Sequence, residues 1–233
     1  MSESGESEVR IEPKNQAQNE ARVPVIAVDP PLKERKEGTM PGTSLDFDAD
    51  VLKHCGGRLT MPDAKLLYET ATAIKPQRIL EIGSMDGCST MILGDVARTH
   101  NGTLQCLEPA PRQKWRANVD RLNLQKNVEL VFASSPWVSM SMINTPIDYL
   151  LIDGDHRTRW AIVDYHYFMP FVRMGGHIAF HDWWDQHDAG KWVREAVEII
   201  LRDDEPFLKK IGEAQNARGL IVFEKTGEHN RYR

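Results

Sequence analysis

The stretch Arg-Ile-Leu-Glu-Ile-Gly-Ser-Met-Asp-Gly-Cys-Ser-Thr at residues 78–90 constrains the fold most strongly. Its first part is a short apolar run, long enough for a strand that is buried on both faces. Gly83 and Gly87 follow, and a helical stretch then continues to Thr99. A strand, a glycine-bearing turn and a helix in this order present free backbone N–H groups at a helix N-terminus, where glycine lets a ligand approach closely. The stretch is typical of a ligand-binding turn, although an ordinary strand-to-helix turn would look the same.

Strand-like and helix-like segments alternate along the rest of the chain. Thr60 and Asp63 mark the start of a first helix, which Pro76 ends. We expect further helices near 89–99, 111–122, 158–172 and 191–203, and strands at 78–83, 103–108, 128–133, 147–153, 176–181, 206–211 and 219–224. This alternation predicts an α/β fold with a doubly wound parallel sheet. The last two strands have no helix between them, so we expect them to add a hairpin to the sheet.

Composition sets the domain organisation and the class of partner. Residues 1–45 are rich in Glu, Ser, Pro, Lys and Gln, which predicts a disordered or loosely docked arm before one folded domain at 46–226 and a polar tail at 227–233. A net charge of −5 argues against nucleic acid as a partner. No apolar run reaches the ~18 residues of a membrane span. Three cysteines without metal-ligand spacing suggest free thiols in a reducing compartment, so we expect a cytoplasmic protein.

The spacing of the glycines narrows the choice of ligand. Gly83 and Gly87 are separated by three residues, whereas the dinucleotide fingerprint is G-x-G-x-x-G, and Glu81 precedes the first glycine by two positions. The second strand ends at Glu108. A carboxylate at that strand end can accept both hydroxyls of a ribose, which indicates a nucleoside cofactor without deciding which one.

Two later strands also end in polar side chains. The fourth ends Ile-Asp-Gly-Asp-His at 152–156, and the fifth reads Gly-Gly-His-Ile-Ala-Phe-His-Asp at 175–182. Open α/β sheets bind ligands at the carboxyl ends of their strands, so both segments should face one crevice. Trp160, Trp183 and Trp184 flank these segments and either line the crevice or pack in the core. We expect His177, inside the strand, to be structural.

These motifs resemble those of a known family. Glu-x-Gly-x-x-x-Gly resembles the first motif of class I S-adenosylmethionine (SAM) methyltransferases. The two polar segments resemble a bacterial group of small-molecule O-methyltransferases, which includes macrolide-sugar methyltransferases and, more distantly, catechol O-methyltransferase. The resemblance covers about residues 60–225 and implies a Rossmann-like, mostly parallel sheet of seven strands with an antiparallel C-terminal strand. It implies SAM as cofactor, with contacts from Glu81, Gly83, Ser84, Gly87, Ser89, Glu108, Ser134, Ser135 and Asp153.

The resemblance also implies a metal and a base. Its members hold a divalent cation at the positions of Asp153, His181 and Asp182, where it binds two substrate oxygens and acidifies one. A carboxylate is usual where this chain has His181, and imidazole suits manganese, iron or zinc better than magnesium. Either the metal differs, or His181 points elsewhere, or no metal binds. His156 stands where relatives carry a catalytic lysine or histidine, so a neutral imidazole there, with Asp153 beside it, would remove the hydroxyl proton.

We therefore expect a SAM-dependent O-methyltransferase of natural-product biosynthesis. Its acceptor would be a hydroxylated small molecule such as a sugar, polyketide or phenol, with magnesium or manganese as the cation. We expect no nucleic-acid or membrane partner and leave a homo-oligomer open. Three alternatives remain at this point: an NAD-dependent oxidoreductase, a non-catalytic SAM-binding relative and a hydroxylase.

Overall fold

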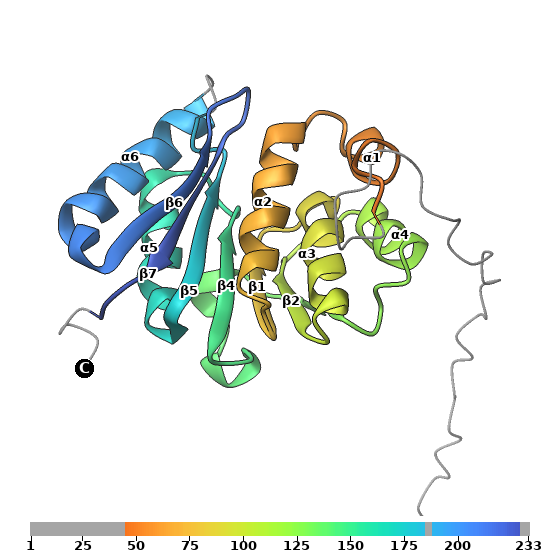
Figure 1. Ribbon diagram of the computed structural model, residues 1–233, viewed down its shortest axis with the longest axis horizontal. Coiled ribbons are helices and arrows are strands. Elements are labelled where there is room, and N and C mark those ends of the chain that lie inside the picture. Colours follow the sequence, from red (N-terminus) through yellow and green to blue (C-terminus); the bar gives the residue numbers. More distant parts are fainter. Residues whose placement is uncertain (1–44, 185–187, 229–233) are drawn as a thin grey trace, which may run out of the picture. The chain divides into compact units, whose positions relative to one another are not determined.

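The computed structural model describes residues 45–184 and 188–228 (Figure 1). The predicted arm at 1–45 lies outside this part except for its last residue, Leu45, which is buried. Most of the predicted polar tail also lies outside it. No helix in the described ranges is long and apolar enough to cross a membrane.

A seven-stranded sheet in the order β3-β2-β1-β4-β5-β7-β6 forms the centre of the fold. Its strands are β1 (Arg78–Ile82), β2 (Thr103–Leu107), β3 (Val128–Val131), β4 (Ile147–Ile152), β5 (Val172–His181), β6 (Leu208–Ala214) and β7 (Leu220–Lys225). The first five are parallel to one another, and β7 runs antiparallel between β5 and β6. The predicted sheet, including the C-terminal hairpin, is confirmed. Among the strands, the largest boundary difference is at β5, which begins at Val172 and shifts register against β4 across the two glycines at 175–176. The helix predicted at 158–172 ends at Phe168.

Helices cover both faces of the sheet (Figure 1). They are α1 (Lys53–Cys55), α2 (Met61–Ala73), α3 (Cys88–Thr99), α4 (Gln113–Arg121), α5 (Thr158–Phe168) and α6 (Asp188–Asp204). Successive residues of a strand point to opposite faces. Accordingly, Ile79 packs in the apolar cluster that contains α2 and α3, whereas Leu80 packs in the cluster that contains α5 and α6. Burial on both faces explains why the strands read as continuous apolar runs.

The segment before α2 contains structure that the sequence analysis did not predict. A π-helical stretch, Phe47–Leu52, continues into α1. Val51 and Cys55 of this segment are buried in the cluster of α2 and α3. Its apolar residues are too few and too short in span to show a helical period, so no pattern marks it.

The cysteine prediction is wrong for two of the three residues. Cys55 and Cys88 form a disulfide between α1 and the start of α3, with Cα atoms 5.7 Å apart, and Cys106 is free and buried. An odd count does not prevent one pair from bonding when the fold brings the two residues together. Disulfides are typical of oxidising compartments, so the argument from cysteines for a reducing compartment loses its support.

Candidate active site

A cavity of about 680 Å³ opens at the carboxyl ends of β1, β2, β4 and β5. Parallel strands end at the same edge of a sheet, which is why segments far apart in sequence meet there. Ten of the predicted site residues line it: Gly83, Ser84, Ser89, Glu108, Ser134, Ser135, Asp153, His156, His181 and Asp182. Glu81 and Gly87 do not belong to its lining. The structure therefore brings nearly all of the predicted residues to one place.

Gly83 lets the turn after β1 lie directly against the end of β4. Its φ is +82°, in the left-handed region, and a Cβ at this position would clash with the backbone carbonyl of Asp153. On the other side, its N–H donates to the carbonyl of Leu107 at 2.9 Å. A residue with a side chain would be strained by its backbone conformation and by lack of space.

Glu108 lies against the same turn. Its Oε2 accepts hydrogen bonds from the N–H groups of Ser84 at 3.1 Å and Met85 at 3.0 Å, and its Oε1 accepts from Ala110 N–H at 2.9 Å. The carboxylate is thus fixed between the end of β2 and the glycine turn, at the wall of the cavity. This is the position from which the sequence analysis expects it to reach a ribose.

Glu81 lies beneath the cavity. Its side chain is fully buried and accepts hydrogen bonds from the hydroxyls of Ser89 and Thr90 and from the thiol of Cys106. Burial raises the pKa of Glu81 to about 7, although these three donors oppose the rise. Because Ser89 and Thr90 belong to the first turn of α3, Glu81 anchors the helix that follows the glycine turn. A cofactor contact from Glu81, as expected from the sequence, has no direct path to the cavity.

Gly87 also has a structural role. It is the N-cap of α3 with φ +83°, and a Cβ would lie 3.1 Å from the ring of Trp115. The glycine permits the left-handed turn into α3 and the close packing of α4.

Asp164 is a site residue that the sequence analysis missed. It lies on α5, lines the cavity and is only 2% exposed. The hydroxyl of Ser135, in the loop after β3, donates to its Oδ1. Burial raises the pKa of Asp164 to about 6. An available signal was that Asp164 interrupts the apolar stripe formed by Ala161, Tyr165 and Phe168, since a carboxylate on a buried helical face requires a partner.

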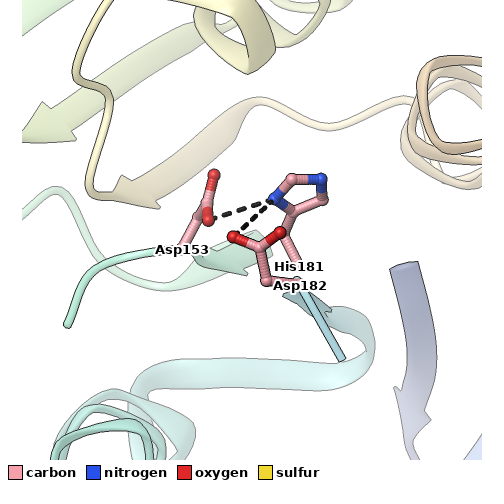
Figure 2. Close-up of side chains that lie close together, drawn as sticks. All are labelled: Asp153, His181 and Asp182. Atoms are coloured by element: carbon pink, nitrogen blue, oxygen red, sulfur yellow. Dashed lines mark hydrogen bonds and ion pairs between the residues drawn. The ribbon is translucent and has the colours of Figure 1, made fainter. Parts of the chain in front are cut away.

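His181 and Asp182 point into the cavity from the end of β5. Consecutive residues of a regular strand would face opposite sides. Asp182 instead has φ +57°, in a region that Asp adopts more readily than most residues with a side chain. This turn places Oδ2 of Asp182 3.7 Å from Nδ1 of His181, and Oδ1 of Asp153 lies 3.1 Å from the same nitrogen (Figure 2). The three predicted metal ligands therefore converge.

His156 joins the other side of this group. Its Nε2 lies 2.8 Å from Oδ2 of Asp182 and 3.5 Å from Oδ1 of Asp153. Two carboxylates and two imidazoles thus alternate at the edge of the sheet. Arg218, from the segment before β7, also lines the cavity, and its Nη1 lies 3.5 Å from Oδ1 of Asp182.

The electrostatics of this group follow from its alternating charges. Burial alone would lower the pKa values of both histidines, but the facing carboxylates raise the pKa of His181 to about 9 and that of His156 to about 10. Burial alone would raise the pKa of Asp153, but His181 and His156 hold it well below its usual range. With these partners, His156 is a positively charged imidazolium near neutral pH. The sequence predicts a neutral imidazole there, because a base must be able to accept a proton.

The three residues Asp153, His181 and Asp182 fit a divalent cation by their chemistry. They offer two carboxylate oxygens and an imidazole nitrogen, and these atoms lie within 4.8 Å of one another. Clustered buried carboxylates need positive charge nearby, which either imidazolium groups or a cation can supply. The mixed set suits manganese, iron or zinc better than magnesium.

One tryptophan lies at the cavity and two lie at the core. Trp160 lines the cavity, whereas Trp183 is buried in the cluster of α5 and α6. Trp184 packs against that cluster, and its ring centroid lies 4.1 Å from the guanidinium carbon of Arg194. His177 is structural as expected, because it is buried and its Nδ1 lies 2.9 Å from the carbonyl oxygen of Thr70.

Comparison with known proteins gives this geometry a family context. Residues 80–183 match a family model described as a methyltransferase domain. The chain has the class I methyltransferase fold. It resembles an O-methyltransferase from Bacillus cereus in complex with S-adenosylhomocysteine (SAH), with 19% identity over 76% of this chain and 86% of that one and a TM-score of 0.59. The O-methyltransferase TomG from Streptomyces achromogenes, in complex with SAM, is 18% identical over 72% of this chain and 82% of that one, also with a TM-score of 0.59.

A third neighbour shows what the fold leaves open. An rRNA methylase from Streptococcus thermophilus is 11% identical over 72% of this chain and 99% of that one, with a TM-score of 0.56. The domain match and the O-methyltransferase neighbours agree on the methyltransferase fold. At these identities the structures establish the methyltransferase fold, and the acceptor has to be argued from the site.

Proposed function

We propose that this methyltransferase transfers the methyl group of SAM to a hydroxyl of a small molecule such as a sugar, polyketide or phenol, with a divalent cation at Asp153, His181 and Asp182. One observation carries the proposal. A single cavity is lined both by the glycine turn with Glu108 and by the acid–histidine group, which consists of Asp153, His156, His181 and Asp182. A nucleoside cofactor and a hydroxylated acceptor would then bind in the same cavity. Such a cavity, at about 680 Å³, falls within the usual range for small-molecule sites.

The chain's own residues must align the reactants, receive a proton and exclude water. Glu108 would accept hydrogen bonds from the ribose hydroxyls of the cofactor, because it lines the cavity at the glycine turn, and Ser84 and Ser89 line the cavity beside it. A cation at the proposed ligands would hold two neighbouring acceptor oxygens and lower the pKa of the one to be methylated.

We assign proton removal to His156. Its Nε2 contacts the carboxylates of Asp153 and Asp182, which are the carboxylates proposed as cation ligands. These carboxylate oxygens cannot contact the histidine and bind a cation equally well. When a cation binds them, the imidazole of His156 would lose its carboxylate partners and could accept a proton from a molecule in the cavity. His156→Gln should then lower kcat by about 10²–10⁴-fold while SAH affinity stays near that of the wild type. Unchanged kcat would assign His156 a structural role.

The acceptor class is argued from charge. The chain carries a net charge of −5, which disfavours a polyanion such as rRNA despite the rRNA methylase among the structures of this fold. Methylation of a hydroxylated small-molecule library, with no incorporation into ribosomal RNA, is the expected result. The reverse pattern would overturn this part of the proposal.

Calorimetry separates the proposal from its rivals. We expect SAM and SAH to bind with heat and NAD to give none. Binding of NAD alone would favour an oxidoreductase, and binding of SAH without turnover of any acceptor would favour a non-catalytic relative.

If the cation contributes, activity should fall in chelator and return with manganese, and Asp182→Asn should require more manganese than the wild type. Full activity after exhaustive chelation, with no metal in the purified protein, would remove the cation from the mechanism.

A further inference from the structure

The two ring nitrogens of His181 face different acidic groups. Nδ1 faces Asp153 and Asp182, at 3.1 and 3.7 Å. Nε2 is buried and has no hydrogen-bond partner within the described residues. The carboxylate oxygen on that side is Oδ2 of Asp63, 4.0 Å away. The side chains are 6% and 0% exposed, so water has little access to this pair.

Asp63 is held in place by two separate elements. Its Oδ2 accepts hydrogen bonds from the hydroxyl of Thr60 at 2.6 Å and from the N–H of Thr60 at 3.3 Å, which completes the capping box of α2. Its Oδ1 accepts from Nδ2 of Asn216, between β6 and β7, at 2.8 Å. Asn216 is itself fixed, because its Oδ1 accepts from the N–H groups of Arg218 and Gly219. The sequence analysis identified Asp63 only as part of a helix start.

A helix cap alone does not account for this arrangement. Capping does not require a buried carboxylate, and burying a carboxylate has an energetic cost. Asp63 nevertheless is completely buried, and its Oδ2 lies 4.0 Å from Nε2, the ring nitrogen of His181 that does not face Asp153 and Asp182. One carboxylate thus faces Nε2 of His181, and two others face Nδ1.

We propose that Asp63 is a positioning residue that accepts the Nε2 proton of His181 and thereby leaves Nδ1 free as a cation ligand. This inference rests on the cation in the proposed function. A neutral imidazole carries its proton on one nitrogen, and a metal binds the other. Without Asp63, the tautomer in which Nδ1–H donates to Asp153 would be favoured, and that proton would block the ligand. The 4.0 Å separation exceeds hydrogen-bond length, and we expect it to shorten when Nδ1 is engaged.

Manganese binding by the full chain tests the inference, with Thr60→Val as the matched control. Asp63→Asn removes the carboxylate charge that faces His181, whereas Thr60→Val removes the other half of the capping box and keeps that charge. We expect Asp63→Asn to weaken Mn²⁺ affinity by about 10- to 100-fold, as loss of an outer carboxylate typically does, and Thr60→Val to leave it unchanged. Equal affinities of Asp63→Asn and the wild type, or equal losses in both variants, would overturn the inference. If the wild type itself binds no Mn²⁺, the cation in the proposed function fails as well.

A measurement on the wild type keeps the test independent of how the variants fold. Long-range ¹H–¹⁵N spectra report which nitrogen of a histidine carries the proton, and a His181→Gln spectrum identifies the signals of His181. With Zn²⁺, which is diamagnetic, we expect the proton on Nε2. A proton on Nδ1, or a His181 ring whose signals do not respond to Zn²⁺, would overturn the assignment.

Discussion

Replacing Glu81 by glutamine should change how stability depends on pH. The Glu81 side chain is fully buried and burial raises its pKa from 4.5 to about 7. The native state therefore favours the protonated form. A raised pKa in the native state means that the stabilisation is complete below about pH 4.5 and is lost as the pH rises through about 7.

The expected magnitude follows from the two pKa values. Each tenfold change in an equilibrium constant is worth about 1.4 kcal/mol, so ionising Glu81 in its buried position should cost about 3 kcal/mol of unfolding free energy. Glutamine keeps the size of the side chain and has no charge to lose. Urea unfolding of the wild type and Glu81→Gln at several pH values from about 4 to 8 gives this difference directly, and other titrating groups cancel in the comparison. The wild type should lose stability relative to the variant as the pH rises.

Two results would refute the reasoning. A stability difference that is constant across the pH range would mean that Glu81 does not change its protonation state there. A large loss of SAH affinity in Glu81→Gln, with the pH dependence unchanged, would instead make Glu81 the direct cofactor contact that the sequence analysis expected. The comparison of the wild type with Glu81→Gln tests Glu81 alone, because the glycine turn is unchanged in both proteins.

Three further changes test other parts of the structure. Gly83→Ala should weaken SAH binding and destabilise the protein by about 3 kcal/mol or more, because its new Cβ meets the backbone carbonyl of Asp153 in addition to the strain of a positive φ. Gly56→Ala, also at positive φ but with no atom within 4 Å of the new Cβ, should cost only about 1–2 kcal/mol and serves as the control. Equal losses in thermal denaturation would contradict the steric argument. Cys55→Ser breaks the bond to Cys88, across a separation of 33 residues, and should lower stability by about 2–4 kcal/mol, and the midpoint of denaturation of this variant should no longer respond to reductant. Glu108→Ala should weaken SAH binding by about 10- to 150-fold in calorimetry if the carboxylate binds ribose, and an unchanged affinity would limit Glu108 to supporting the turn.

Periodic features of the chain were predictable from the sequence because they depend on local pattern. The strands β1 and β4 read as buried apolar runs, and the helix α6 shows a regular apolar stripe. The polar residues at the strand ends were predictable as neighbours because parallel strands end at one edge. The fold and the meeting of ten predicted site residues in one cavity follow from these two facts.

The remaining features depend on contacts that no local pattern encodes. The pairing of Cys55 with Cys88 requires the position of α1 on α3, and α1 itself is too short to be periodic. The left-handed backbone at Asp182 decides that it points to the same side as His181, and regular strand alternation predicts the opposite. Likewise, Asp63 is a recognisable helix cap in the sequence, whereas its position behind His181 is set by tertiary packing.

The position of β7 in the sheet has a consequence for the order of synthesis. This strand lies between β5 and β6 and pairs Leu220 with His181, so the strand beside the acid–histidine group is translated after every other strand. Residues that would bind the cofactor, from Gly83 to Glu108, leave the ribosome more than a hundred residues earlier. The nucleoside half of the cavity can thus be ordered on the nascent chain while β5 still has an open edge. The surroundings of the acid–histidine group are therefore completed last on the nascent chain, when the hairpin pairs with β5.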